Sequence, residues 1–545
     1  MDDKKPEIVI GLAGPAGTDL QALAQTIVEK MSPFGYRCQD IRVSQLIQEF
    51  CDAALTAKIA EAKHGEKVRL LMGAGDTLRK QLGRGSALIP LVVASIRSAR
   101  KSFLTVEQSG PAAVENPNLQ SDKPCEEPSV DAPADQACYI INSLKHPDEV
   151  RELKRIYGEN FILISGFSSL EERTSQLCEL IAKSHTSTQN DKYKDEAQKL
   201  ISLDAQRPGE KLGQSLRDTF HLADFFVRVS GDYEREVERF LDLLFGSPYI
   251  TPRFDEFHMF EAKAKSYRSA DLSRQVGAVI VDHAANMVAS GCNEVPIAGG
   301  GSYWPDEDKA FDNRDHIKRR DYNAVKKYEI IEELISFMTA QGILQLNDKS
   351  SATEVVEQLL FGASSAKFKD LRVSNLIEFG RVVHAEMNAI TEAARRGVMI
   401  GGGTIYCTTF PCHMCARHII AAGIKKVVYI EPYPKSMTAD LYDESVIIDG
   451  DGGHGPEGER QSHPKVVFVP FEGVAPSIYT DLYRAGTRKG ARGYTIDWNR
   501  ASARPKSIRT GAAHLSLETP LFNELEQLRE VSLEEAQGKW ESSQC

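Results

Sequence analysis

Four residues in the second half of the chain have the types and spacing of a catalytic metal site. Cys412 and Cys415 are three residues apart, so at the start of a helix both sulfurs can lie on one face and bind one ion. His384 and Glu386 come earlier in the chain. One imidazole and two thiolates suit zinc, and three protein ligands leave one of its four positions open for chemistry. Glu386, which is not needed as a ligand, is predicted to move protons.

The sequence around these residues predicts the elements that position them. Pro411 precedes Cys412, and proline suits a helix start because its missing N–H would have no intrahelical partner there. Residues two apart diverge on a regular helix, so His384 and Glu386 can face one site only if His384 stands at the very beginning of its helix. Residues 385–395 are good helix formers, which agrees with this. Two helix N-termini are therefore predicted to point at the metal, where their partial positive charge favours thiolates.

A structural zinc site is the main alternative for a Cys-x-x-Cys pair. Such a site needs a fourth Cys or His at similar spacing, and His413 and His418 are the nearby candidates. We interpret both as surface or packing histidines. Both half-motifs occur in order, each at a predicted helix start, which favours a catalytic site that holds one Zn²⁺ ion per chain.

Composition excludes several functional classes. The 545 residues suggest two to four domains, and ten cysteines in so long a chain do not indicate a disulfide framework. No apolar run reaches membrane-spanning length and the N-terminus lacks the apolar core of a signal peptide, so we expect no membrane association and a cytoplasmic location. The net charge of -11 disfavours a long nucleic-acid substrate, although it is compatible with a single nucleotide or a local basic groove.

Residues 1–245 are predicted to form a parallel α/β domain. Short apolar runs alternate there with helix-like sequence, which is typical of strand–helix–strand units. The first run enters a glycine-rich turn before a helix, as phosphate-binding loops do, and its candidate nucleotide-binding residues are Gly14, Gly17 and Thr18. A polar stretch at about 105–135 is predicted to be a disordered insertion or mobile loop.

A second domain is predicted to begin near residue 246 and to run to residue 545. It contains several strand patterns and a long insertion at about 297–379. The insertion could form a substrate lid, an allosteric site or a subunit contact. Its carboxylates and His316 could bind a second ion, but charged runs of this kind are more often solvated loops.

These motifs resemble those of the deoxycytidylate deaminases over about 257–500. The resemblance rests on Ser273-Arg-Gln-Val-Gly-Ala-Val-Ile-Val, Gly291-Cys-Asn293-Glu-Val-Pro, His384-Ala-Glu386 and Pro411-Cys-His-Met-Cys415. It implies a cytidine-deaminase-like α/β/α domain with a mixed sheet, in which Asn293 contacts the sugar and base. The implied chemistry is attack of a zinc-activated water on C4 of cytosine, with Glu386 passing protons to N3 and helping ammonia leave.

With its first domain included, the chain resembles the bacterial anti-phage dCTP/dCMP deaminases. These proteins pair a P-loop kinase-like domain with a deaminase domain and deplete deoxycytidine nucleotides during infection. The resemblance implies a deoxycytidine nucleotide substrate and a homo-oligomer. It also allows a nucleotide effector at the N-terminal domain and an inhibitory RNA or protein partner.

The glycine-rich loop departs from the P-loop pattern at two positions. Thr18 stands where the Walker lysine is expected, and Asp19 replaces the usual Ser or Thr. Without the lysine, phosphoryl transfer is not expected. Nucleotide sensing through backbone N–H groups and a degenerate loop kept for packing are both compatible with this sequence.

Candidate phosphate-binding residues in the second domain are Arg274, Lys435 and Ser436, together with a basic stretch at 484–509.

The sequence favours zinc-dependent deamination of dCTP and/or dCMP to dUTP or dUMP plus ammonia. The alternatives are a tRNA or single-stranded DNA deaminase with the same zinc signature, a housekeeping dCMP deaminase that supplies dUMP, and a nucleotide sensor without activity. The sequence leaves the choice between dCMP and dCTP open, because both need the same base pocket.

Overall fold

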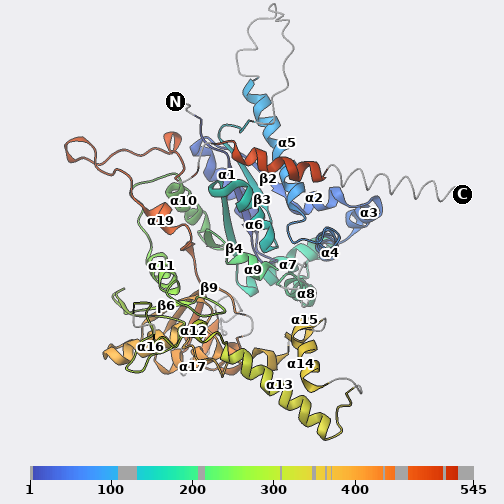
Figure 1. Cartoon of the computed structure of the whole chain (residues 1–545). Helices are drawn as coiled ribbons and strands as arrows, with labels where there is room; N and C mark the ends of the chain where they lie inside the picture. The colour runs from blue at the N-terminus through green and yellow to red at the C-terminus, as the bar shows by residue number, and fades with distance from the viewer. Residues whose placement is uncertain are drawn as a thin grey trace, which may run out of the picture. The chain divides into compact units, whose positions relative to one another are not determined.

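The computed structural model describes residues 4–108, 132–205, 215–306, 310–346, 351–362, 365–369, 371–433, 436–448, 464–506, 508 and 511–525. The chain divides into two compact units (Figure 1). Unit 1 comprises Met1–Pro252 and Glu472–Cys545, and unit 2 comprises Arg253–Phe471. Residues 109–131, the greater part of the predicted insertion, lie outside the described residues.

Unit 1 is built on a sheet of six strands in the order β12-β5-β4-β1-β3-β2. Five of them are parallel, as the sequence predicts, and β12 pairs antiparallel with β5. β1 is buried along its whole length, which is typical of a parallel strand covered on both faces. The kinase-like assignment of this unit stays a prediction. The strands are β1 Ile8–Ala13, β2 Arg37–Arg42, β3 Ala137–Asn142, β4 Phe161–Phe167, β5 Phe225–Arg228 and β12 Gly473–Val474.

Helices cover both faces of this sheet. On one face, α1 and α10 pack together over the apolar side chains of β1, β4 and β5, while α5, α6 and α9 contact strands of the same sheet elsewhere. Besides the helical segment 513–525, the α-helices in the described part of unit 1 are α1 Leu20–Met31, α2 Val43–Phe50, α3 Ala53–Glu61, α4 His64–Gln81, α5 Ile89–Gln108, α6 Pro147–Tyr157, α7 Leu170–Ser184, α8 Lys194–Ala205, α9 Leu216–Phe220, α10 Tyr233–Leu244 and α19 Tyr479–Tyr483.

The prediction that the second domain runs to residue 545 is wrong, because the chain returns to unit 1 at Glu472. β12 adds to the edge strand β5, which would otherwise leave backbone groups unpaired. The helical segment 513–525 brings Glu518 and His514 to buried partners: Glu518 lies 2.7 Å from Arg100, and His514 lies 2.8 Å from Glu7. Glu7 also pairs with Arg100 at 2.8 Å. Breaking such a buried pair leaves an uncompensated charge, so these contacts hold the returning segment on unit 1.

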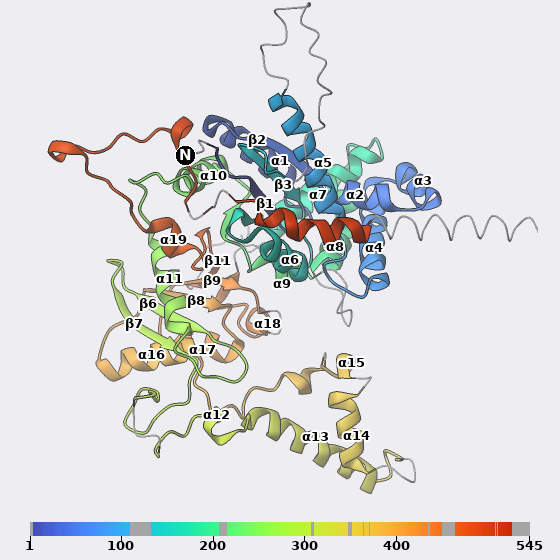
Figure 2. The same cartoon turned by 45° about the horizontal axis from the view of Figure 1, so that its top comes forward.

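Unit 2 contains the predicted mixed sheet between helices, with strand order β10-β11-β9-β8-β6-β7. β6 runs antiparallel to β7 and β8, whereas β8, β9, β11 and β10 are parallel. Helices α16 and α17 pack on one face, and α11 packs on the sheet as well, next to β6 and β8 (Figure 2). The elements are α11 Phe254–Ser266, β6 Gly277–Val281, β7 Met287–Cys292, α16 Ala385–Arg396, β8 Thr404–Thr409, α17 His413–Ala421, β9 Lys426–Glu431, α18 Thr438–Leu441, β10 Val446–Ile448 and β11 Val466–Pro470.

Where the structure describes the predicted insertion, it has the α-helices α12 Asp315–Lys318, α13 Tyr322–Ala340, α14 Ala352–Phe361 and α15 Ser365–Lys369. α13 and α14 pack against each other around Ile331, Ile335 and Val356, which form a small core of their own (Figure 2). Among the described residues of the whole chain, no helix combines the length and the apolar character needed to cross a membrane.

Gly291 allows α16 to lie directly against β7. A Cβ atom at this position would collide with the backbone of α16 at Ala385 and Ala389. We expect Gly291→Ala to lower the free energy of unfolding by about 1–3 kcal/mol, and to lower kcat as well, because α16 carries Glu386. Gly277→Ala is the matched control, since its Cβ would meet the backbone of α11 instead.

Chemical denaturation and steady-state kinetics of both glycine variants test this prediction. The expected result is a similar loss of stability in both, with a loss of kcat only in Gly291→Ala. Equal kcat values in the two folded variants would show that the close approach of α16 to β7 does not position the site.

Candidate active site

The three predicted metal ligands stand at the starts of two neighbouring helices. His384 is the N-cap of α16 and Cys412 is the N-cap of α17, both with extended backbone angles, and Cys415 lies in the first turn of α17. α16 and α17 pack against each other, which brings the two helix starts together. The predicted helix starts at both half-motifs are therefore confirmed.

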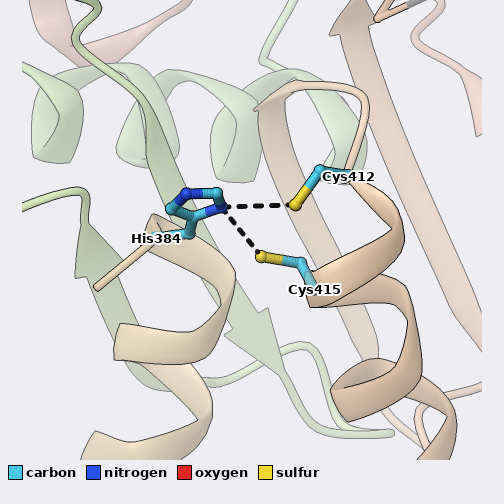
Figure 3. A group of neighbouring side chains, drawn as sticks. All are labelled: His384, Cys412 and Cys415. Carbon is cyan, nitrogen blue, oxygen red and sulfur yellow. Dashed lines mark hydrogen bonds between the residues drawn. The ribbon is translucent and has the colours of Figure 1, made fainter. Parts of the chain in front are cut away.

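The three ligand atoms form one compact cluster (Figure 3). Nδ1 of His384 lies 3.3 Å from Sγ of Cys412 and 3.4 Å from Sγ of Cys415. A tetrahedral zinc with its usual bond lengths places nitrogen and sulfur ligands about 3.6 Å apart. The spacing and the donor set therefore fit one Zn²⁺ ion. Among the described residues, no second group of three possible ligands is found, at His316 or elsewhere.

The three ligands shift one another's pKa values even without a bound cation. A hydrogen bond from Cys415, helped by His384, lowers the pKa of Cys412 to about 4, whereas the contact with Cys412 and burial raise the pKa of Cys415 well above its ordinary value. The hydrogen bond to Cys412 raises the pKa of His384 to about 9 even though burial opposes it. Cys412 is thus a thiolate at neutral pH, whereas Cys415 and His384 release their protons when a metal binds.

Glu386 lies in the first turn of α16, beside the ligand cluster and not within it. Only 4% of its surface is exposed, and its Oε2 accepts a hydrogen bond of 3.5 Å from Sγ of Cys415. Burial raises the pKa of Glu386 to about 7, with a further contribution from the negative charge of Cys412. A carboxyl group with a pKa near neutrality can both accept and donate a proton, as a general acid–base group must.

A cavity of about 410 Å³ opens onto the cluster. His384, Glu386 and Cys412 line it, and so does Asn293. The amide of Asn293 is tied to the backbone, because Oδ1 accepts from the N–H of Val276 and Nδ2 donates to the carbonyl oxygen of Arg274, each at 2.7 Å. Asn293 therefore fixes the backbone of the cavity wall just before β6. Its amide keeps one N–H and one lone pair of the oxygen with which it can bind a ligand.

The predicted phosphate-binding residues have different outcomes. Arg274 lines the cavity, is about half exposed and pairs with Glu431 at 3.0 Å. Ser436 is not among the described lining residues; its hydroxyl donates to the carbonyl oxygen of Pro411 at 2.9 Å and so braces the residue before Cys412. Lys435 lies outside the described residues.

Several lining residues carry no motif that sequence reasoning could use. Arg381 lines the cavity, and it donates to Asp315 at 2.6 Å and to the carbonyl oxygen of Asn313 at 3.1 Å. The insertion supplies part of the cavity wall too, because Asp315 also lines the cavity. The one feature of the sequence that could have indicated Arg381 as a site residue is its position three residues before His384. Other lining residues that the sequence did not single out are Asp271, Leu272, Asp321, Asn323, Ile377, Val382, Thr409, Phe410 and Tyr433.

The predicted nucleotide-binding loop of unit 1 lines a separate cavity of about 610 Å³, with Gly14, Gly17 and Thr18 on its wall. Gly14 and Gly17 have a packing role, because Cβ atoms there would collide with the backbone at Gly166 and Arg173. Asp19 caps α1, accepting from the N–H of Ala22 at 2.9 Å.

A family model of the cytidine and deoxycytidylate deaminase zinc-binding region matches residues 252–431. This range is about a third of the chain and contains His384, Glu386, Cys412 and Cys415. The match falls almost entirely within unit 2.

Curated proteins match over a shorter stretch. A deoxycytidylate deaminase of enterobacteria phage T2 is 54% identical over 54 residues, which are 10% of this chain and 29% of that protein. ComE operon protein 2 of Bacillus subtilis is 51% identical over 53 residues, 10% of this chain and 28% of that protein. The chain thus spans less than a third of the length of these relatives. A solved dCMP deaminase from cyanophage S-TIM5, in complex with dCMP and dUMP, is 21% identical with a TM-score of 0.20, covering 36% of this chain and 94% of that chain.

Proposed function

We propose that the chain is a zinc-dependent hydrolase that deaminates free deoxycytidine nucleotides, dCMP and/or dCTP, to dUMP or dUTP plus ammonia. The observation that carries this proposal is the position of Glu386. Its buried carboxyl group lies beside a His/Cys/Cys cluster and lines a cavity of about 410 Å³. A cavity of this size suits one nucleotide. The curated relatives with the name deoxycytidylate deaminase support the choice of base and sugar.

His384, Cys412 and Cys415 would hold the zinc, which would supply a Lewis acid that lowers the pKa of a bound water. Glu386 then performs the proton transfers. It takes a proton from the attacking water and gives it to N3 of the ring as the oxygen bonds to C4. It next takes the proton of the new hydroxyl group on C4 and delivers it to the exocyclic nitrogen, so the C4 carbonyl forms, the C4–N bond breaks, and ammonia leaves. Cytosine plus water thereby becomes uracil plus ammonia.

The phosphate of the substrate needs cations at the cavity, and we assign this role to Arg274 and Arg381. Both line the cavity, and each is paired with a carboxylate, Glu431 for Arg274 and Asp315 for Arg381. Partly exposed pairs of this kind contribute little to stability, so a phosphate dianion can compete for either arginine. Asp271, Asp315 and Asp321 also line the cavity. Their negative charges repel the many phosphates of a polynucleotide backbone. This disfavours a polynucleotide substrate.

A competition assay tests the proposal. The purified chain receives dCMP, dCTP, CMP, deoxycytidine and a cytosine-containing single-stranded oligonucleotide together, and uracil products are resolved by mass spectrometry. We expect uracil in dCMP or dCTP and at least about 100-fold less in deoxycytidine, because the nucleoside lacks the charge that the arginines bind. Uracil in the oligonucleotide alone would replace the proposal with a polynucleotide deaminase.

Depletion of deoxycytidine nucleotides in defence against phage is the biological role that we propose on the resemblance described above. It differs from housekeeping supply of dUMP in its consequence for infected cells. Cells that express the chain should lose dCTP and plate phage poorly, and cells that express Glu386→Gln should do neither. Equal plating on both strains would favour the housekeeping role.

A further inference from the structure

The cavity of unit 1 lies where the order of the strands reverses. From β1 the chain builds β2 and β3 on one side of that strand and later β4 and β5 on the other side. Ligands of parallel α/β sheets bind outside the carboxyl ends of the strands at such a switch point. The loop that follows β1 and the loop that follows β3 both line the cavity, with α2 and α4 beside them.

The lining of this cavity combines three kinds of groups. Apolar side chains of α2, α4 and α7 offer a surface for a flat ring, among them Ile47, Leu71 and Leu177. Side-chain amides offer hydrogen bonds to a base edge, and cations gather at the same cavity. Asp19 is the one carboxylate among the described lining residues, and its Oδ1 already accepts from the N–H of Ala22. The lining amides include Gln45 and Gln48, and the cations include Arg42, Lys67 and Lys145.

Lys145 brings an amine to the loop that lacks its own lysine at position 18. It comes from the loop after β3, and its Nζ donates to the carbonyl oxygen of Gly14 at 2.8 Å. The same Nζ lies 2.9 Å from Oδ1 of Asp204, and Oδ2 of Asp204 accepts from the N–H of Ala16 at 2.7 Å. The carboxylate of Asp204 thus accepts from a backbone amide of the loop and from a lysine. In a phosphate-binding loop these two kinds of donor bind a phosphate oxygen. Asp204 is 1% exposed, so solvent screens this pair little.

We propose that the cavity of unit 1 binds a nucleoside phosphate, with Lys145 as the cation for the phosphate and with Asp204 as an internal anion that competes for it. The base and sugar lie against the apolar and amide lining, and Lys67 at the first turn of α4 supplies a second positive charge. We expect this site to bind the nucleotide without transferring a phosphoryl group. Thr18 replaces the lysine of a transferase loop, and Asp19 replaces its metal-binding hydroxyl residue. The proposal is independent of the deaminase chemistry of unit 2.

Isothermal titration calorimetry of the full chain with ATP and with dTTP tests this site. Neither probe contains cytosine, so failure here is distinguishable from failure of the proposed deamination. We expect binding to the unmodified chain, at least about tenfold weaker binding to Lys145→Gln, and at least about threefold tighter binding to Asp204→Asn, because asparagine keeps the bond to Ala16 and removes the competing charge. No binding of either probe to the chain or to Asp204→Asn would overturn the proposal.

Two further variants keep the test decisive if a change at the buried pair unfolds unit 1. Lys67 is partly exposed, and Lys67→Gln should fold normally and bind the probes at least about threefold more weakly. Lys58→Gln is the matched control, because Lys58 is exposed on α3 and does not line the cavity. Melting temperatures confirm folding. Equal binding by Lys67→Gln, Lys58→Gln and the unmodified chain would place the probe elsewhere and overturn the proposal.

Discussion

Replacement of Glu386 by glutamine is expected to lower kcat for dCMP deamination by about 10²–10⁴-fold, the range that a positioned acid–base group contributes. Glutamine has nearly the shape of glutamate but can neither take a proton from water nor return it to the leaving nitrogen. The zinc content should stay at one ion per chain, because Glu386 lies beside the ligand cluster and outside it. KM should change little, because the change removes a group that acts in the transition state.

Steady-state kinetics and elemental analysis of the same preparations check this result. Glu392→Gln is the matched control: Glu392 lies on the same helix, six residues further along, and does not line the active-site cavity. We expect its kcat to equal that of the unmodified chain. If Glu386→Gln deaminates dCMP at the normal rate, Glu386 does not carry the protons and the proposed mechanism is wrong.

The sequence predicts the site well where the required information is local. The helix starts at His384 and Cys412 follow from a proline, from helix-forming residues and from the spacing of two cysteines, and the structure confirms both. Strands of unit 2 such as β6, β8 and β9 also follow from local patterns, whereas the mixed order of the sheet is expected only from the resemblance to deoxycytidylate deaminases.

Features that depend on contacts between distant segments could not be predicted in this way. The return of the chain to unit 1 rests on pairing of a two-residue strand with β5 and on buried partners for Arg100, and neither has a local pattern. The place of Arg381 in the cavity depends on Asp315 in the insertion. The amine at the glycine-rich loop comes from Lys145, more than a hundred residues after the position where the loop pattern expects it.

Replacement of Cys415 by serine is expected to abolish zinc binding and deamination together. Cys415 is fully buried, and its sulfur lies 3.4 Å from Nδ1 of His384. A serine hydroxyl is a poor zinc ligand at neutral pH, and its C–O bond is too short to reach the position of the sulfur. Because the loss of groups outside the ligand set already weakens metal binding about 10–100-fold, loss of a ligand should weaken zinc binding by at least about 100-fold. Cys51→Ser in unit 1 is the control for the exchange of sulfur for oxygen.

A chelator separates loss of the metal from loss of the fold. Binding of an ion to the folded state alone raises the melting temperature, so a chelator should lower the melting temperature of the unmodified chain and of Cys51→Ser. Cys415→Ser should melt at the lower temperature without a chelator and should not respond to one. If Cys415→Ser retains one zinc per chain and still responds to the chelator, then His384, Cys412 and Cys415 do not form the ligand set, and the assignment of Glu386 as its proton carrier fails with it.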